Sequence, residues 1–160
     1  MSRIAKRFSE LASKNRKALI TYLVAGDPSL DVTEMLMHKM VASGADLLEI
    51  GMPFSDPIAE GAIIQAAHHR ALSNSVDLRK VLDTVNRFRL EDKNTPVVLM
   101  GYLNPIEKMG YETFARAANI AGLDAVLTVD LPVEELNYSR DLFDQFELDT
   151  ILIQIDQTNL

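Results

Sequence analysis

Two carboxylates, Glu49 and Glu60, flank a loop rich in glycine and proline within the segment LEIGMPFSDPIAEGAIIQAA at 48–67. Glu49 lies in an apolar stretch that is expected to form a strand, whereas Glu60 lies beyond the loop that this strand feeds. A carboxyl group in dry surroundings can hold a raised pKa and transfer protons, while a better solvated one stays ionised and stabilises positive charge. The pair is therefore typical of acid-base chemistry at carbon.

The elements that would position this pair alternate between strands and helices. Apolar residues at helical spacing predict an amphipathic helix over 2–14. Strands are expected at 18–24, 46–50, 96–102, 125–129 and 151–155, and helices at 30–44, 63–72, 77–90, 111–121 and from just after Pro132 to Phe146. Asn104 and Pro105 are expected in a loop. Glu134 and Glu135 are expected in the first turn of the last helix, where negative charge suits the helix dipole.

This order predicts parallel strands with right-handed crossovers. A five-stranded doubly wound sheet and part of a (β/α)₈ barrel share the pattern, and periodicity does not separate them. No GxGxxG follows the first strand and no GxxxxGK[ST] occurs, so nucleotide-binding open sheets lose support. The polar residues Asp27, Asn104 and Asp130 follow strand ends, as the segment 49–60 does, and both folds place their sites there.

Composition predicts one domain, 1–160, in the cytoplasm. The chain is 48% apolar, but it has no run long enough for a membrane span and no apolar core of a signal peptide near its start. The absence of cysteine excludes disulfides, and a net charge of −7 with scattered bases argues against nucleic acid. His38, His68 and His69 are interpreted as surface helix residues rather than metal ligands, because adjacent helical residues point about 100° apart.

Four segments resemble the tryptophan synthase α subunit family. They are AGDPS at 25–29, GADLLEIGMPFSDPIAEGAIIQAAHHRAL at 44–72, LMGYLNPI at 99–106 and AGLDAVLTVDLPVEE at 121–135. They occur in the family's order and spacing across essentially the whole chain, and GMPFSDP beside the Glu49 strand is highly specific.

The resemblance implies a (β/α)₈ TIM barrel, of which these residues would form the N-terminal helix and about the first five strands. It also implies a carbon-carbon lyase of tryptophan biosynthesis, which cleaves indole-3-glycerol phosphate to indole and glyceraldehyde 3-phosphate in a reverse aldol reaction. Indole would pass to a β subunit within an α₂β₂ heterotetramer. No cofactor is expected in this subunit, since pyridoxal phosphate is expected only in the β subunit.

The resemblance also assigns roles to the two carboxylates. Glu49 matches the family's catalytic glutamate and would move protons to indole C3 and from the hydroxyl that becomes the aldehyde. Glu60 stands where the family has an aspartate that accepts the indole N–H and stabilises the cation. The extra methylene changes its reach, and Ala62 replaces the usual proline of this loop, so weakened rather than inverted chemistry is expected.

Two further sets of residues follow from the same matching. The indole pocket would be lined by Tyr22, Met100, Tyr102, Leu127, Val129 and Ile153, and the β-subunit contact would include Pro53, Phe54, Asp56, Asn104 and Pro132. Strand alternation supports the pocket, since Leu47 and Glu49 share a face. Tyr22, Met100 and Tyr102 are equally consistent with plain core, and Asp56 with a turn residue. Asp27 and Asp130 are better interpreted as structural hydrogen-bonding residues.

A barrel of this kind has eight strands, and its phosphate site lies in loops after the seventh and eighth. Those loops and the loop after the sixth strand are not among the 160 residues, so these residues alone are expected to be inactive. Two hypotheses stay open. One is a lyase whose sequence is incomplete here, and the other is a non-catalytic relic of the same family that binds a partner through the GMPFSDP surface. An unrelated phosphate-binding barrel would not require GMPFSDP.

Overall fold

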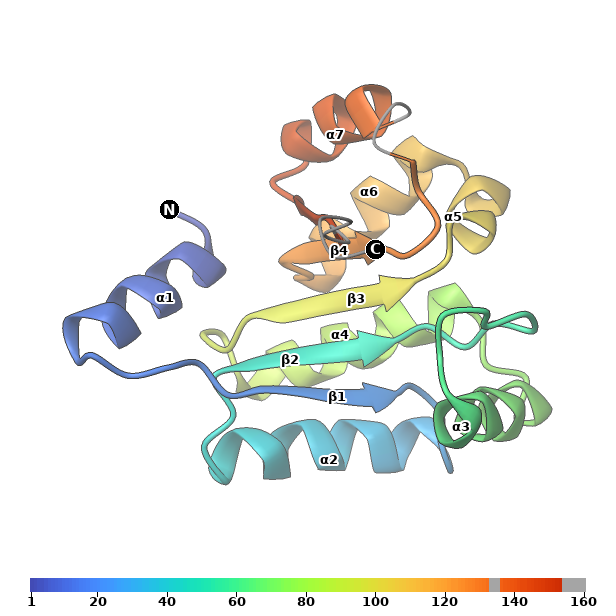
Figure 1. The fold of residues 1–160 in the computed structure, drawn as a ribbon, viewed down its shortest axis with the longest axis horizontal. Coiled ribbons are helices and arrows are strands. Elements are labelled where there is room, and N and C mark those ends of the chain that lie inside the picture. The colour runs from blue at the N-terminus through green and yellow to red at the C-terminus, as the bar shows by residue number, and fades with distance from the viewer. Residues whose placement is uncertain (133–135, 154–160) are drawn as a thin grey trace, which may run out of the picture.

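Five parallel strands form one sheet in a computed structural model that describes residues 1–132 and 136–153. The strands are β1 (Ile20–Val24), β2 (Leu47–Gly51), β3 (Val97–Gly101), β4 (Ala125–Thr128) and β5 (Asp149–Ile151). Each strand pairs with its successor in sequence, in the order β1-β2-β3-β4-β5 (Figure 1). A doubly wound sheet reverses its strand order at a switch point, whereas a barrel adds each strand beside the last. The sheet is therefore an arc of a (β/α)₈ barrel.

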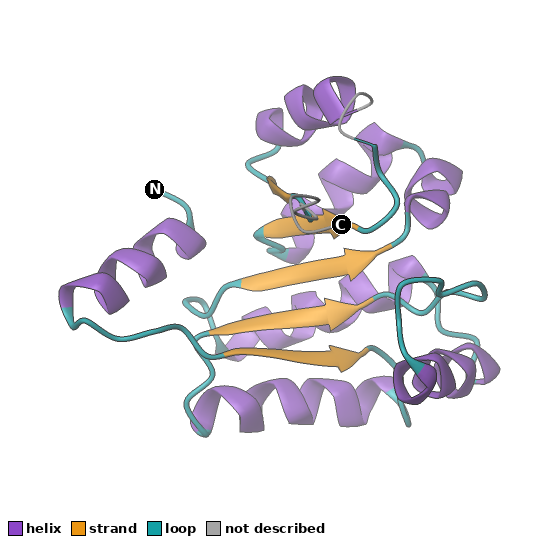
Figure 2. Ribbon diagram, viewed as in Figure 1, coloured by secondary structure: helices purple, strands orange, loops and turns teal. Residues whose placement is uncertain are grey.

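Helices cover one face of this sheet (Figure 2). Along that face α2 contacts α4, α4 contacts α6 and α6 contacts α7, following the order of the strands. The helices are α1 (Arg3–Ser13), α2 (Leu30–Ala42), α3 (Ala62–Ser73), α4 (Leu78–Glu91), α5 (Leu103–Met109), α6 (Tyr111–Ala121) and α7 (Leu136–Gln145). Ser29 and Asp77 cap α2 and α4 by accepting hydrogen bonds from backbone N–H groups of the first turn.

The main core lies between the sheet and its helices. Leu48, Ile50 and Leu99 point to this face and are buried against residues such as Phe88 of α4 and Phe114 of α6. Residues at alternate strand positions point to the opposite, concave face. Among the described residues, that face carries a small buried cluster of Leu47, Val98 and Ala125, against which Ile4 of α1, Leu127 and Ile151 pack.

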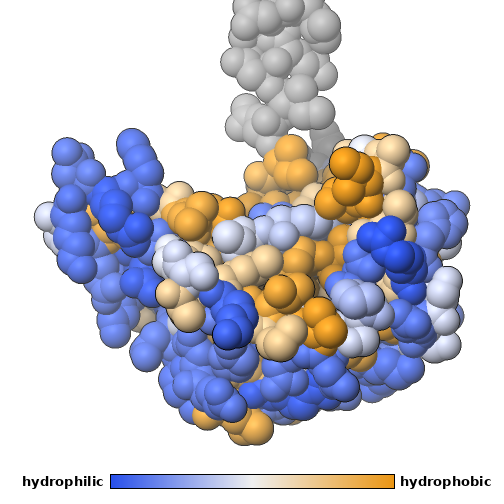
Figure 3. Space-filling model, turned by 90° about the horizontal axis from the view of Figure 1, so that it is seen from below, coloured by the Kyte–Doolittle hydropathy of each residue, from blue (hydrophilic) through white to orange (hydrophobic). Residues whose placement is uncertain are grey.

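The concave face is open beyond this cluster. Ile20 on β1 is 47% exposed, and Met100 and Leu127 are half-buried. Figure 3 shows hydrophobic surface gathered between the mostly hydrophilic α1 on the left and a more mixed surface on the right. Because burial of apolar area stabilises a fold by about 25 cal/mol per Å², this face favours contact with further chain or with an apolar ligand.

Asn104 and Pro105 lie in a helix, α5, so the prediction of a loop there is wrong. Pro105 is the third residue of this helix, where the missing N–H would have no intrahelical partner. The Asp130 carboxylate accepts a hydrogen bond from the Leu103 backbone N–H at 2.7 Å and so fixes the start of α5. The interpretation of Asp130 as a structural residue is confirmed.

The fifth strand begins earlier than its apolar residues predict. β5 covers Asp149–Ile151 rather than 151–155, of which 154 and 155 lie outside the described residues. Pairing decides the boundary, because Asp149 lies opposite Ala125 and its N–H donates to the Asp124 carbonyl at 2.9 Å. Glu134 and Glu135 also lie outside the described residues. The other predicted strands and helices are confirmed to within a few residues of their ends.

Within the described residues, the helices are all too short or too polar to span a membrane.

Candidate active site

Glu49 lies in the middle of β2, on the concave face. It stands opposite Tyr22 of β1 and Val98 of β3 in the strand register, and its side chain is half-buried. Burial raises the pKa of the Glu49 carboxyl above its ordinary value. Among the described residues, no side chain or backbone group donates a hydrogen bond to this carboxyl group, and no cation pairs with it. An unpaired carboxyl group with a raised pKa is suited both to giving and to taking a proton.

Glu60 is held by the loop and by the end of β3. Its side chain is 8% exposed, and Oε2 accepts a hydrogen bond from the hydroxyl of Tyr102. The same hydroxyl accepts the backbone N–H of Ala59 at 3.0 Å, and Gln65 Nε2 donates to the Glu60 carbonyl at 2.8 Å. Burial and the bond to Glu60 raise the pKa of Tyr102 to about 12, so its hydroxyl keeps its proton. Glu60 is thus anchored as an acceptor.

The Tyr22 hydroxyl lies close enough to both carboxylates for their charges to act on it. A Cβ at Gly51 would collide with this hydroxyl, which explains the glycine at the end of β2. Burial raises the pKa of Tyr22, and the charges of Glu60 and Glu49 raise it further. Among the described residues the buried Tyr22 hydroxyl has no hydrogen-bond partner. It is a protonated donor that lacks an acceptor.

His68 is buried, and its prediction as a surface residue is wrong. It is 1% exposed on the inner face of α3, whereas the neighbouring His69 is exposed as predicted. The small side chains of Ala67 and Ala71 leave room for the imidazole on that face. His68 Nδ1 accepts the backbone N–H of Phe54 at 3.0 Å, which satisfies a loop donor that has no strand or helix partner.

His38 is partly exposed, unlike buried His68 and exposed His69, and its side chain is 31% exposed. Its ring packs on Phe88 of α4, with 4.7 Å between the ring centroids. No cluster of three possible metal ligands occurs within 1–132 and 136–153.

The residues proposed to line an indole pocket do not all meet. Met100 and Leu127 are paired in register and lie half-buried on the concave face, as Glu49 does. Tyr102 is 2% exposed and directs its hydroxyl to Glu60, and Val129 follows β4 half-buried. Ile153 lies beyond β5 and is 51% exposed, so the described residues do not enclose it.

Three of the residues proposed for a partner contact lie together. Pro53, Phe54 and Asn104 line one groove, which also contains the cationic side chains of Arg79 and Lys108. The Phe54 ring stacks on Tyr102 with 4.8 Å between centroids, which links the groove to the Glu60 anchor.

The other two residues proposed for this contact, Asp56 and Pro132, are exposed and do not line the groove. Asp56 accepts a hydrogen bond from the Ser55 hydroxyl at 2.6 Å, as a turn residue would. Asp27 forms a two-pronged ion pair with Arg70, which confirms its structural interpretation.

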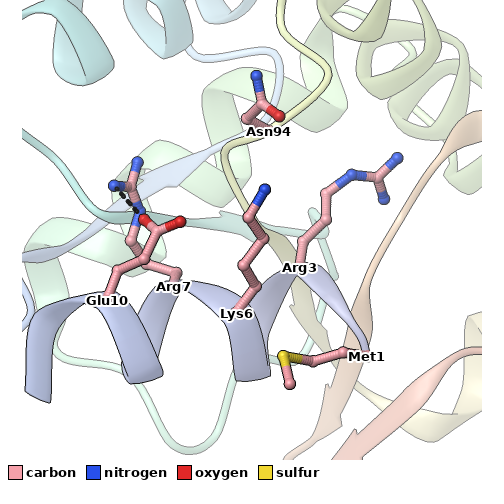
Figure 4. A pocket seen from close by; sticks show the side chains of 6 residues that line it. All are labelled: Met1, Arg3, Lys6, Arg7, Glu10 and Asn94. Carbon is pink, nitrogen blue, oxygen red and sulfur yellow. Dashed lines mark ion pairs between the residues drawn. The ribbon is translucent and has the colours of Figure 1, made fainter. Parts of the chain in front are cut away.

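A second hollow lies at the other end of the strands, along α1 (Figure 4). It is lined by Met1, Arg3, Lys6, Arg7, Glu10 and Asn94. Arg7 pairs with Glu10 at 3.6 Å, and Arg3 pairs with Asp124 at 2.9 Å. In barrels of this type the N-terminal end of the strands serves stability, whereas the chemistry lies at the C-terminal end.

The strand order and the two carboxylates define the class. This is the first part of a (β/α)₈ barrel with a candidate acid-base site at the C-terminal ends of its strands. The chain belongs to the tryptophan synthase alpha chain family, whose model matches residues 8–159.

Curated relatives agree with this assignment. The tryptophan synthase alpha chain of Thioalkalivibrio sulfidiphilus is 62% identical over 142 residues, covering 89% of this chain and 52% of the relative. That of Neisseria gonorrhoeae is 56% identical over 154 residues, covering 96% of this chain and 58% of the relative. The chain therefore spans about half the length of the curated relatives it matches.

Solved structures show the same fold. The α subunit of Legionella pneumophila superposes with a TM-score of 0.92 at 48% identity, covering 94% of this chain and 57% of that one. A chain of the tryptophan synthase complex of Pyrococcus furiosus gives 0.82 at 39% identity, covering 86% of this chain and 56% of that one. The prediction of a TIM-barrel family fold is confirmed.

Proposed function

We propose that this chain supplies the acid-base groups of a lyase that cleaves indole-3-glycerol phosphate to indole and glyceraldehyde 3-phosphate. One observation carries the proposal. Glu49 is a half-buried carboxyl group with a raised pKa and without a partner among the described residues, and it faces a concave wall that includes Met100 and Leu127. Family membership and the position of Glu60 support the same chemistry.

The reaction moves two protons and one electron pair. Glu49 in its acid form protonates indole C3, which makes an indolenine cation. The bond between C3 and the glycerol carbon then breaks, and its electron pair returns to the indole ring. The hydroxyl on that carbon becomes the aldehyde as it gives its proton to the Glu49 carboxylate. Glu49 ends as it began, and a raised pKa suits both transfers.

Glu60 and the apolar wall hold the substrate in this mechanism. The Glu60 carboxylate accepts the indole N–H and stabilises the cation, while Tyr102 fixes one of its oxygens. Met100 and Leu127 provide apolar surface for the ring. Because the protons move through Glu49 and the electron pair of the broken bond returns to the indole ring, no cofactor is required in this subunit, and pyridoxal phosphate is expected in the β subunit.

A β subunit is the proposed partner, in an α₂β₂ assembly in the cytoplasm. Support comes from a Pyrococcus furiosus relative whose structure is described as a tryptophan synthase a2b2 complex. The groove lined by Pro53, Phe54 and Asn104 lies next to the Glu60 anchor and is the proposed contact. Indole made at the concave face would pass to that partner. A β subunit that binds without changing the rate would contradict coupling through this loop.

The experiment joins this chain, after residue 153, to the C-terminal part of the Legionella pneumophila α subunit. We expect the fusion to release indole from indole-3-glycerol phosphate and the Glu49→Gln fusion to release almost none. The 160 residues alone are expected to be inactive, since their five strands leave the concave face open. A folded fusion that makes no indole would contradict the proposal, as would a Glu49→Gln fusion with full activity.

A non-catalytic relic that binds the partner is the second candidate. It is favoured by the glutamate at position 60 where the family's aspartate is expected. In that case the folded fusion would bind a β subunit and release no indole.

A further inference from the structure

His68 approaches the Glu60 carboxylate at the oxygen that Tyr102 does not bind. The two residues come from α3 and from the loop before it, and His68 Nε2 lies 4.0 Å from Glu60 Oε1. The other carboxylate oxygen, Oε2, is already occupied by the Tyr102 hydroxyl. The carboxylate therefore has one oxygen held and one oxygen turned toward a buried imidazole.

The loop decides which imidazole nitrogen carries the proton. The Phe54 backbone N–H donates to His68 Nδ1, and a nitrogen that accepts a hydrogen bond carries no proton. Burial lowers the pKa of His68 below its ordinary value, against the opposite effect of the Glu60 charge. In the neutral ring the proton is then on Nε2, the atom that faces Glu60.

This Nε2–H has no hydrogen-bond partner within the described residues, although the imidazole is 1% exposed. A buried donor without an acceptor costs about 1–3 kcal/mol, so closing the gap to Glu60 by about 1 Å is favourable. Hydrogen bonds of catalytic groups are often long in the unliganded protein and shorten when substrate binds. The geometry is that of a contact that tightens around a ligand.

We propose that His68 is a positioning residue for Glu60, and that its Nε2–H and the Tyr102 hydroxyl together fix both oxygens of that carboxylate. The proposal rests on the lyase function proposed above. A glutamate side chain has three rotatable bonds, so a single hydrogen bond leaves its carboxylate free to turn. A neutral donor orients the carboxylate without cancelling the charge that stabilises the indolenine cation.

Two NMR measurements on the 160-residue chain test the contact independently of any activity. At neutral pH, ¹⁵N spectra of the imidazole groups are expected to show His68 as the Nε2–H tautomer. The Glu60→Gln chain is expected to shift the His68 Nε2 signal and to leave exposed His69 unchanged. The proposal would be overturned by a Nδ1–H tautomer, by a charged ring, or by a His68 Nε2 signal that does not shift in the Glu60→Gln chain.

Kinetics of the active fusion test the positioning role. His68→Leu is expected to lower kcat about tenfold to a hundredfold with little change in KM, because it leaves Glu60 loosely oriented. His68→Gln, which keeps a donor near the Nε2 position, is expected to recover much of kcat, and His69→Gln serves as the matched control on the exposed side of the helix. Equal kcat values for His68→Leu and the parent would overturn the proposal.

The two tests separate the two claims. An inactive parent fusion combined with the Nε2–H tautomer would refute the proposed function, and with it the part that positioning by His68 plays in the reaction, while the contact itself stands. An active fusion combined with the wrong tautomer would refute this inference alone.

Discussion

The two ends of the sheet differ in how far their buried polar groups are hydrogen-bonded. At the N-terminal end, Asp124 is 4% exposed and accepts hydrogen bonds from Arg89 at 2.7 Å, from the Val97 N–H at 2.8 Å and from Arg3 at 2.9 Å. Toward the C-terminal end, the buried Tyr22 hydroxyl and His68 Nε2 have no hydrogen-bond partner among the described residues, and within the strands the same is true of the Thr21 and Thr150 hydroxyls. The half-buried Glu49 carboxyl lies beside Tyr22 on the neighbouring strand.

This difference separates stability from chemistry. Arg89 donates to the Gly122 and Thr95 carbonyls as well as to Asp124, so the N-terminal end is a closed network within the chain. Asp46 repeats the arrangement, with Arg16 and the Leu19 N–H on its two oxygens. Unsatisfied polar groups cost free energy and persist where they serve a ligand or a reaction. The C-terminal end is where this fold is expected to bind substrate.

Glu49→Gln should have the largest effect on activity of all these changes. If it does not, the chemistry cannot be assigned to the C-terminal end of the sheet. Loss of the proton carrier is expected to lower indole release by the fusion about a hundredfold to ten-thousandfold. The matched control is Glu112→Gln on α6, whose side chain is 66% exposed. Similar rates for the two variants would place the chemistry away from β2.

Asp124→Ala tests the opposite end. Removing one partner of a buried ion pair leaves Arg89 uncompensated and is expected to cost about 3–5 kcal/mol in the free energy of unfolding. Burial already lowers the pKa of Arg89, and Asp124 is the main charge that opposes this. Urea denaturation measures the change, with exposed Asp56→Ala as control. A loss below about 1 kcal/mol would show that the network does not hold this end together.

The pH dependence of stability sharpens the contrast at Glu49. Its pKa is raised in the folded state, so the protonated form favours folding. This contribution is complete below the ordinary pKa and is lost as the pH rises through the folded-state pKa. The Glu49→Gln chain lacks this loss, so its stability relative to the parent should rise as the pH increases from about 4.5 to the folded-state pKa of Glu49. A difference that is constant over this range would mean that the carboxyl group is not desolvated.

Tyr22→Phe should have the smallest effect on stability. Its hydroxyl has no partner among the described residues, so removing it should change the free energy of unfolding by no more than about 1 kcal/mol, toward greater stability. Urea denaturation of the two chains gives this value. A clear loss of stability would reveal a hydrogen bond to the hydroxyl.

Much of the fold could be predicted from the sequence because it depends on local pattern. Apolar runs and helical spacing located four of the five strands and most of the helices, and β2 placed Glu49 on the concave face as its alternation requires. The start of β5 depends on pairing with Ala125 rather than on its own residues, so its apolar run misplaced it. Asn104 and Pro105 are expected in a loop from the sequence, yet proline is tolerated in the first turn of α5.

The candidate site could be predicted only in part, for a similar reason. Glu49 and Glu60 are visible as carboxylates around a loop, and the GMPFSDP segment identifies that loop. The burial of His68 depends on Phe54, whose N–H needs an acceptor once the loop folds over α3. Spacing alone gives no such contact, although Ala67 and Ala71 mark the inner face of the helix on which His68 lies.

Titration of the Glu49 carboxyl carbon by ¹³C NMR tests the central claim most directly. The claim is that this group sits desolvated and unpaired in the concave face, ready to transfer a proton. The account predicts a midpoint clearly above the ordinary glutamate value of 4.5. A midpoint for Glu49 at or below 4.5 would contradict it.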